Sequence, residues 1–200
     1  MRTKPDELLW ADFVSGNDEA YRVIYVSHIQ SLFKYGCHFT TDEHLIQDCI
    51  HDLFIDLYNY RSRLNKTDNI KIYLFVSLKR KIIKHLEKEK KRNSVKSEEI
   101  SFEYSLVADN SEENELNEMR IQYLEKAMKE LSARQKEAIY LKYVTGLSYE
   151  ELCNVLNLNY QAARNLVYRG MEKLRESCTK NSLLLWLMLT KKNKCFYRKN

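Results

Sequence analysis

The sequence is poor in residues that interrupt helices, with four glycines and one proline among 200 residues. Folds built from β-strands need frequent turns, and turns are rich in glycine and proline. This shortage argues against a turn-rich β fold, and we expect an all-α fold class. The length allows one large domain or two small ones, each with a real hydrophobic core.

The residues needed for covalent or metal chemistry are also scarce. The five cysteines are an odd number, widely spaced, without a CxxC pair, which argues against a disulfide framework and a cysteine zinc site. His44, Asp48 and His51 share a helix face, but no second ligand-rich segment completes a metal site. No nucleophile–base set, phosphate-cradling glycine loop or paired catalytic carboxylates are visible. We expect no enzyme activity, cofactor, metal or small-molecule substrate.

A long apolar run is missing as well. The longest, Leu183 to Leu189, is far shorter than the ~20 residues of a membrane-spanning helix. No signal-peptide pattern precedes Asp6, so we expect a cytoplasmic protein. The apolar and then basic tail, residues 179–200, could extend the last helix, dock on a partner or touch an anionic membrane surface.

Charge divides the chain into segments. The net charge is +5, and residues 79–96 hold nine Lys or Arg against two Glu. The sign then reverses, because Ser97 to Glu118 contains eight acidic residues and no Lys or Arg. So acidic a segment with few apolar residues is typical of a flexible linker. We therefore predict two helical domains, residues 6–93 and 119–178, joined by an acidic linker over 94–118.

Apolar periodicity predicts four helices in the first domain. They cover about 8–14, a segment capped by Asp18 and ending near Gly36, a segment opening at Thr40 to Glu43, and about 70–92. The fourth follows a polar loop, residues 61–69. A basic helix behind a polar loop could bind phosphates and stack unpaired bases, although a solvated face of a bundle helix has the same composition.

The second domain contains a helix-turn-helix pattern. Ser132 to Gln135 and Ser148 to Glu151 are capping patterns, and Asn159 opens a helix that reaches Glu176. At 100° per residue, one stripe of this last helix is small and apolar: Ala163, Val167, Gly170 and Leu174. The outward residues are Gln161, Asn165, Tyr168 and Arg169, flanked by Arg164 and Arg175. Such a face suits the major groove, where Asn and Gln pair with adenine and Arg with guanine, but a solvated surface helix would look similar.

Four segments in this order resemble bacterial RNA polymerase sigma factors. They are FVSGNDEAYRVIYVSHIQSLFKY, QDCIHDLFIDLYNYR, DNIKIYLFVSLKRKIIKHLEKEKKR and KELSARQKEAIYLKYVTGLSYEELCNVLNLNYQAARNLVYRGMEKLRE. The pattern is most similar to the compact extracytoplasmic-function (ECF) group in its Bacteroidetes-like form, which keeps only sigma regions two and four. The first domain corresponds to region two and the second to region four. The resemblance spans about Leu8 to Glu176.

The resemblance implies three sets of site residues. Polymerase binding is implied for Asp48, His51 and Asp52, with His51 standing where Gln is usual. Contact with the minus-ten element is implied for Asn65, Lys66, Asp68, Asn69, Tyr73, Lys79, Arg80 and Lys84. Contact with the minus-thirty-five element is implied for Gln161, Arg164, Asn165, Tyr168 and Arg169. Gly170 stands where the group usually has Ala or Leu.

The resemblance also implies the partners. These are core RNA polymerase, promoter DNA and an anti-sigma factor, which in many group members is a membrane protein. The expected function is promoter-specific transcription initiation with polymerase core. The alternative is a free-standing helix-turn-helix regulator that binds its operator without polymerase.

Overall fold

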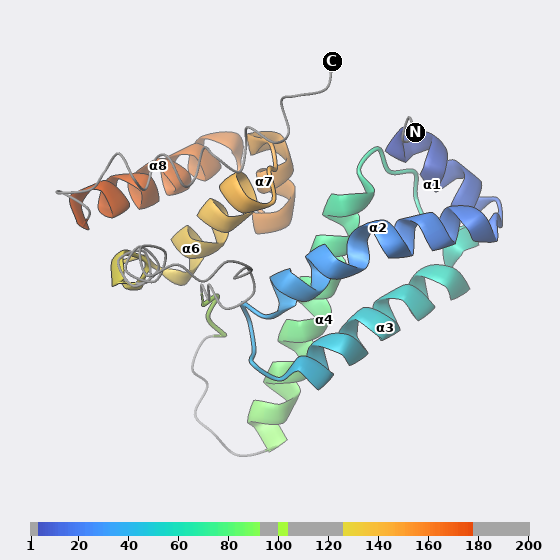
Figure 1. Cartoon of the computed structure of the whole chain (residues 1–200), viewed down its shortest axis with the longest axis horizontal. Helices are drawn as coiled ribbons and strands as arrows, with labels where there is room; N and C mark the ends of the chain where they lie inside the picture. Colours follow the sequence, from blue (N-terminus) through green and yellow to red (C-terminus); the bar gives the residue numbers. More distant parts are fainter. Residues whose placement is uncertain (1–3, 93–99, 104–125, 178–200) are drawn as a thin grey trace, which may run out of the picture. The chain divides into compact units, whose positions relative to one another are not determined.

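Every regular element in the described part of the chain is helical, as the composition predicts (Figure 1). This computed structural model describes residues 4–92, 100–103 and 126–177. The chain divides into two compact units, Met1–Ile100 and Ser101–Asn200. None of the described helices is both long and apolar enough to cross a membrane.

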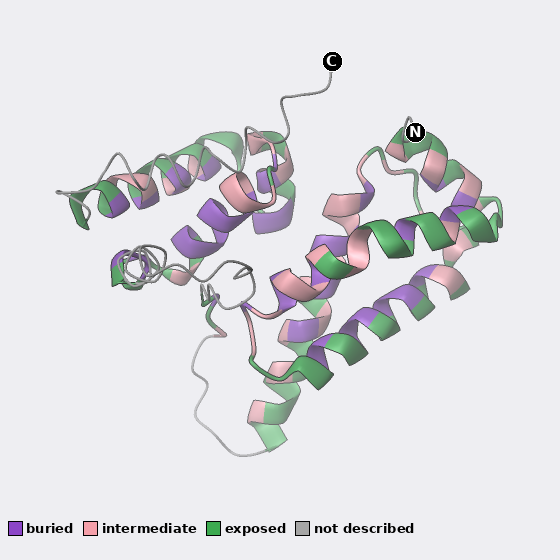
Figure 2. Ribbon diagram, viewed as in Figure 1, coloured by how far each residue is buried: buried purple, intermediate pink, exposed green. Residues whose placement is uncertain are grey.

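The first unit is a helical bundle. It contains α1 (Asp6–Val14), α2 (Asp18–Gly36), α3 (Glu43–Asn59), the short 3-10 turn η1 (Arg61–Arg63) and α4 (Ile70–Arg92). Helices α2, α3 and α4 pack against one another pairwise, and α1 packs on α2 and α4. The buried sides of these helices face inward and their exposed sides outward, as Figure 2 shows. The helix spans agree closely with the predicted segments.

One predicted helix cap is wrong. Asn17, not Asp18, caps α2: its Oδ1 accepts from the backbone N–H groups of Glu19 and Ala20 at 2.9 and 3.1 Å. Asp18 is instead the first residue of the helix. An acidic residue in a first turn complements the helix dipole, so it is favourable there too, and the sequence pattern cannot separate the two positions.

Aromatic side chains dominate the core of the first unit. Trp10, Phe13, Tyr35, Phe54 and Phe75 are almost completely buried. Gly36 allows the end of α2 to approach α3 closely, because a Cβ there would lie 2.6 Å from Ile46 Cγ2. Burial of this kind supplies most of the stability of such a bundle.

The second unit holds the helix-turn-helix. Residues 126–129 are helical and are followed by α6 (Ala133–Ile139), the π-helical turn η3 (Tyr140–Val144), α7 (Tyr149–Leu156) and α8 (Tyr160–Ser177). Both predicted capping boxes form, Ser132 with Gln135 and Ser148 with Glu151. Asn157 has a φ of 53°, and this left-handed residue ends α7 and turns the chain toward α8.

The predicted apolar stripe of α8 is confirmed, since all four of its members are buried. Close packing explains why residue 170 is a glycine. A Cβ at that position would lie 2.8 Å from Ile139 Cδ1 and 3.2 Å from Leu131 Cδ2, so glycine lets α8 lie close over α6. This contact sets the position of the opposite face of α8.

Candidate nucleic-acid interface

The outer face of α8 carries all five residues predicted to contact the minus-thirty-five element. Gln161, Arg164, Asn165, Tyr168 and Arg169 are exposed, while the other side of the helix is buried (Figure 2). Gln161 Nε2 donates a hydrogen bond to Asn165 Oδ1 at 3.1 Å, so these two amides are aligned along the helix. The face combines amide groups and guanidinium groups, the two chemistries that read base edges in a major groove.

Tyr168 differs from its neighbours. A hydrogen bond with the Glu172 carboxylate, one turn further along, raises the pKa of the Tyr168 phenol. The same hydrogen bond holds the hydroxyl toward Glu172. Tyr168 consequently offers its ring, more than its hydroxyl, to a ligand on this face.

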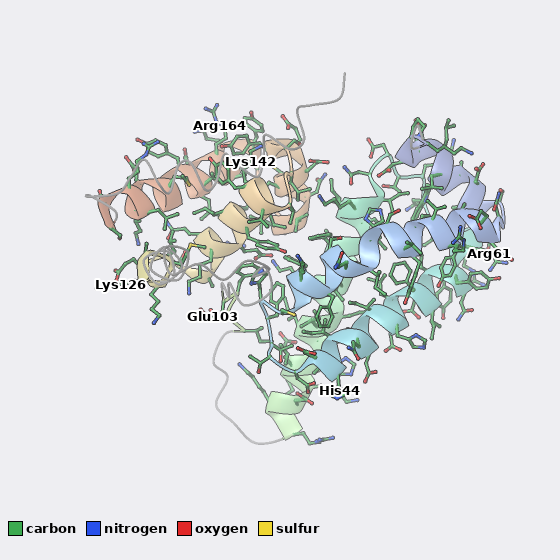
Figure 3. The ribbon with its side chains drawn as sticks, viewed as in Figure 1. His44, Arg61, Glu103, Lys126, Lys142 and Arg164 are labelled. Carbon is green, nitrogen blue, oxygen red and sulfur yellow. The ribbon has the colours of Figure 1, made fainter. Side chains whose placement is uncertain are left out.

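A row of two tyrosine rings with a cation at each end extends the face of α8 toward η3 and α7. Lys142 Nζ lies 4.6 Å from the Tyr149 ring centroid, the Tyr149 and Tyr160 centroids are 5.9 Å apart, and Arg164 Cζ lies 5.9 Å from the Tyr160 centroid. Lys142 is also held by the Leu147 carbonyl at 2.9 Å. Figure 3 shows Lys142 and Arg164 in the same part of the second unit. We call this row the cation–ring row.

The sequence reading did not single out Lys142, Tyr149 or Tyr160. The available signal was Lys142 itself, which lies close in sequence to the start of α7; the first turn of that helix already carries Glu150 and Glu151. Only the folded chain brings Lys142 to this place, because the π-helical turn and the Gly146 bend (φ 75°) intervene.

In the first unit, the polar loop predicted to hold minus-ten bases is tied down at both ends. The indole of Trp10 donates to the Asn65 carbonyl at 2.9 Å, and the Ile70 N–H donates to Asp6 Oδ2 at 3.1 Å. Asn69 Oδ1 accepts from the Ile72 N–H at 2.9 Å and so caps α4. The side chains of the remaining predicted loop residues, Asn65, Lys66 and Asp68, are exposed.

The helix behind this loop presents a basic stripe. At 100° per residue, Tyr73, Arg80 and Lys84 lie within 40° of one another on α4, and exposed Lys88 and Lys91 continue the same line. Lys79 points elsewhere: its ammonium lies 6.0 Å from the Phe39 ring centroid. The structure therefore groups Tyr73, Arg80 and Lys84 and separates Lys79 from them.

The predicted polymerase-binding residues lie on α3. Asp48, His51 and Asp52 are all exposed, on the side opposite the buried stripe. His51 also lines a groove between α2 and α3, whose other walls are Tyr25, Ile29, Gln30, Phe33, Gln47 and Ile50. Beside it, Val26 on α2 and Ile55 on α3 are 61% and 41% exposed. The face thus joins acidic groups to an apolar groove, a mixture typical of a protein-binding surface.

Two family profiles match the chain. One, described as Sigma-70 region 2, matches residues 24–92, and the other, Sigma-70 region 4, matches residues 121–174. Together they cover more than half of the sequence. The chain belongs to the sigma-70 family. Its region 2 therefore runs from within α2 to the end of α4, and its region 4 contains α6, η3, α7 and most of α8.

Curated relatives agree with this membership. The ECF RNA polymerase sigma factor SigM of Bacillus subtilis (strain 168) is 23% identical over 153 residues, covering 76% of this chain and 91% of the relative. RNA polymerase sigma factor SigV of the same organism is 22% identical over 156 residues, covering 78% and 89%. The ECF-type sigma factor assignment is thus favoured over a free-standing regulator.

Two solved structures share the fold. CnrH in complex with the cytosolic domain of CnrY has a TM-score of 0.61 at 19% identity, covering 90% of this chain and all (100%) of that one. The sigma factor RpoE, in complex with the anti-sigma factor NepR from Bartonella quintana, has a TM-score of 0.59 at 18% identity, covering 82% and 99%.

Proposed function

We propose that this sigma factor binds core RNA polymerase and directs promoter-specific transcription initiation by holding two promoter elements at once. The observation that carries the proposal is that each unit has an exposed surface whose chemistry suits nucleic acid, the amide and guanidinium face of α8 in region 4 and the basic stripe of α4 in region 2. Neither surface contains groups arranged for covalent chemistry, which suits a subunit that positions DNA and leaves synthesis to polymerase.

Region 4 would read the minus-thirty-five element through α8. Gln161 and Asn165 would pair with base edges, while Arg164 and Arg169 would contact bases or phosphates. The cation–ring row would hold the adjacent phosphate backbone, because Lys142 and Arg164 bracket two tyrosines that carry further hydroxyl donors. Phosphate contacts fix the register of the helix, and base contacts specify the sequence.

Region 2 would hold the minus-ten element. Its loop presents Asn65, Lys66 and Asp68 as polar groups able to meet an unpaired base, and the stripe of Tyr73, Arg80 and Lys84 would follow the strand's phosphates. Loop anchoring by Trp10 supports this role, because a rigid loop loses less conformational entropy when it captures a base.

Polymerase would bind the face of α3 that carries Asp48, His51 and Asp52. The apolar groove between α2 and α3 adds buried area to what would otherwise be a purely charged contact. Burial of such a groove supplies affinity, while the two carboxylates steer a basic partner and fix its orientation.

We infer that an anti-sigma factor holds this protein inactive in the cytoplasm. The support is structural likeness to the sigma factor RpoE, which was solved with the anti-sigma factor NepR. The exposed groove between α2 and α3 would also offer such a partner a surface to bind whenever polymerase is absent.

Reconstituted transcription tests the proposal. Purified protein added to core RNA polymerase should start transcription at a cognate promoter, and Asp52→Lys should weaken core binding. Glu7→Lys, an exposed residue of α1, makes the same charge change elsewhere and should leave core binding unchanged. Core-independent, site-specific operator binding together with an absence of promoter-specific transcription would refute the proposal.

A further inference from the structure

Part of the acidic linker docks on region 4. Phe102 is 2% exposed, and its ring centroid lies 5.7 Å from that of Tyr140. Glu103 Oε2 is 2.6 Å from Lys136 Nζ, and Ser101 Oγ donates to Glu103 Oε1 at 2.9 Å. Lys136 and Tyr140 lie one helical turn apart, so they receive neighbouring linker residues on one face. We call Ser101, Phe102 and Glu103 the linker clasp (Glu103 is labelled in Figure 3).

The receiving site is built for this contact. The Lys136 side chain is only 10% exposed, whereas that of Glu103 is 66% exposed, and a largely buried lysine side chain is costly unless a carboxylate accompanies its ammonium group. Glu103 supplies that carboxylate, and the hydrogen bond from Lys136 lowers the pKa of Glu103. The clasp therefore combines an apolar anchor with a charged one.

Docking changes how far the two DNA-binding units can separate. With the clasp docked, only eight residues lie between Arg92 and Ser101, and these nine Cα–Cα steps reach ~31 Å at most. The linker would reach ~115 Å if it were free from Arg92 to residue 126, where the described part of the second unit resumes. Docking of the clasp thus removes most of the distance that the linker can span between the two units.

The proposed function sets the distance that the two units must span. Promoter elements at minus-ten and minus-thirty-five are about 25 base pairs apart, or ~85 Å of duplex. The stretch of α4 from Tyr73 or Arg80 to its end adds ~18 to 28 Å, and α8 is ~27 Å long. The docked tether, this stretch of α4 and the length of α8 together measure ~76 to 86 Å. They can span the promoter only if all three lie in one straight line.

We propose that the linker clasp is an autoinhibitory contact. Docked, it keeps the free sigma factor on a short tether that disfavours simultaneous contact with both promoter elements. Its release, coupled to assembly with polymerase and promoter, lengthens the tether and permits the two-point grip. This proposal rests on the proposed function for its purpose, but the docking and its effect on dimensions can be tested without transcription.

Small-angle X-ray scattering of the full chain tests the docking. A flexible tether has a root-mean-square span of ~17 Å for the nine steps of the docked form and ~33 Å for the free linker, so Phe102→Ala should increase the radius of gyration. Leu8→Ala, at an exposed apolar residue of α1, should leave the radius of gyration unchanged. Circular dichroism should show equal helix content in both variants. An unchanged radius of gyration in Phe102→Ala would overturn the proposal.

A charge swap removes the ambiguity of a folding defect. Glu103→Lys places two ammonium groups together and should expand the chain, and adding Lys136→Glu to it should restore the compact dimensions. If the double variant stays as expanded as Glu103→Lys, the Glu103–Lys136 pair does not hold the clasp and the proposal fails.

Transcription then tests the autoinhibition. Phe102→Ala should reach half-maximal transcription at a lower sigma concentration than the parent, about tenfold lower if the docked form is favoured ten to one. An equal or higher requirement would show that the clasp does not inhibit. If the parent itself never supports transcription with core, the proposed function fails, whereas the scattering experiments still decide whether the linker docks.

Discussion

Replacing Asn165 by alanine should relax the sequence preference of the minus-thirty-five reader without unfolding it. The side chain is exposed, and its one described contact is the 3.1 Å hydrogen bond from Gln161. Losing a solvent-exposed hydrogen bond costs at most about 1 kcal/mol, and alanine's better helix propensity returns up to ~0.7 kcal/mol. The stability of the region 4 unit should therefore stay nearly constant.

The effect on DNA should be much larger. A bidentate Asn–adenine contact contributes about 1–3 kcal/mol of discrimination, which is roughly 5- to 150-fold in relative affinity. The assay is transcription by the reconstituted holoenzyme from promoters in which each minus-thirty-five base pair is changed in turn. For Asn165→Ala, the cognate promoter should weaken and the penalty for changing one A·T pair should disappear.

Two further variants complete this experiment. Glu176→Ala, at the exposed end of α8, should keep the parental penalty profile. Gln161→Ala should be non-additive with Asn165→Ala, because the hydrogen bond between the two amides orients both. An Asn165→Ala holoenzyme with the parental penalty at every position would refute base reading by this face.

Three other predictions concern single positions. Lys142→Gln should weaken DNA binding equally on cognate and scrambled duplexes and reduce the salt slope by about one; a sequence-dependent loss would contradict a phosphate contact. Gly36→Ala would place a Cβ 2.6 Å from Ile46 Cγ2, so it should lower the free energy of unfolding, measured by urea titration, by about 1–3 kcal/mol. An unchanged free energy of unfolding would show that the core relaxes freely around the added methyl group. Burial raises the pKa of Cys49 to about 11, so iodoacetamide at pH 8 should modify this thiol only after the protein is denatured. Peptide mass spectrometry would show the modification, and labelling of the native protein would place Cys49 at the surface.

Helix spans and the two faces of α8 were predictable because they depend on local rules. Capping boxes at Ser132 and Ser148 satisfy backbone groups within three residues, so the sequence pattern contains both partners. The burial of Val167 follows from periodicity alone. The cap of α2 was misplaced by one residue because Asn17 and Asp18 are both good caps and only the backbone distinguishes them.

The candidate site was less predictable wherever it depends on packing. Lys79 and Arg80 are adjacent in a uniformly basic sequence, yet one lies over the Phe39 ring and the other on the exposed stripe. Lys142 belongs beside α8 only because η3 and the turn after it carry it there. The sequence alone does not show which basic residues are exposed for contact with DNA, because that depends on the positions of the neighbouring helices.

Local sequence determined that this chain is helical, that a basic module and a helix-turn-helix module flank an acidic segment, and which side of α8 is polar. These features follow from residue propensity, periodicity and capping, which act over a few positions. Tertiary structure alone decided that Phe102 and Glu103, in a segment whose composition predicts a free linker, are docked against Tyr140 and Lys136. The contact joins residues more than thirty positions apart, and its stability comes from burial and charge pairing that no local pattern encodes.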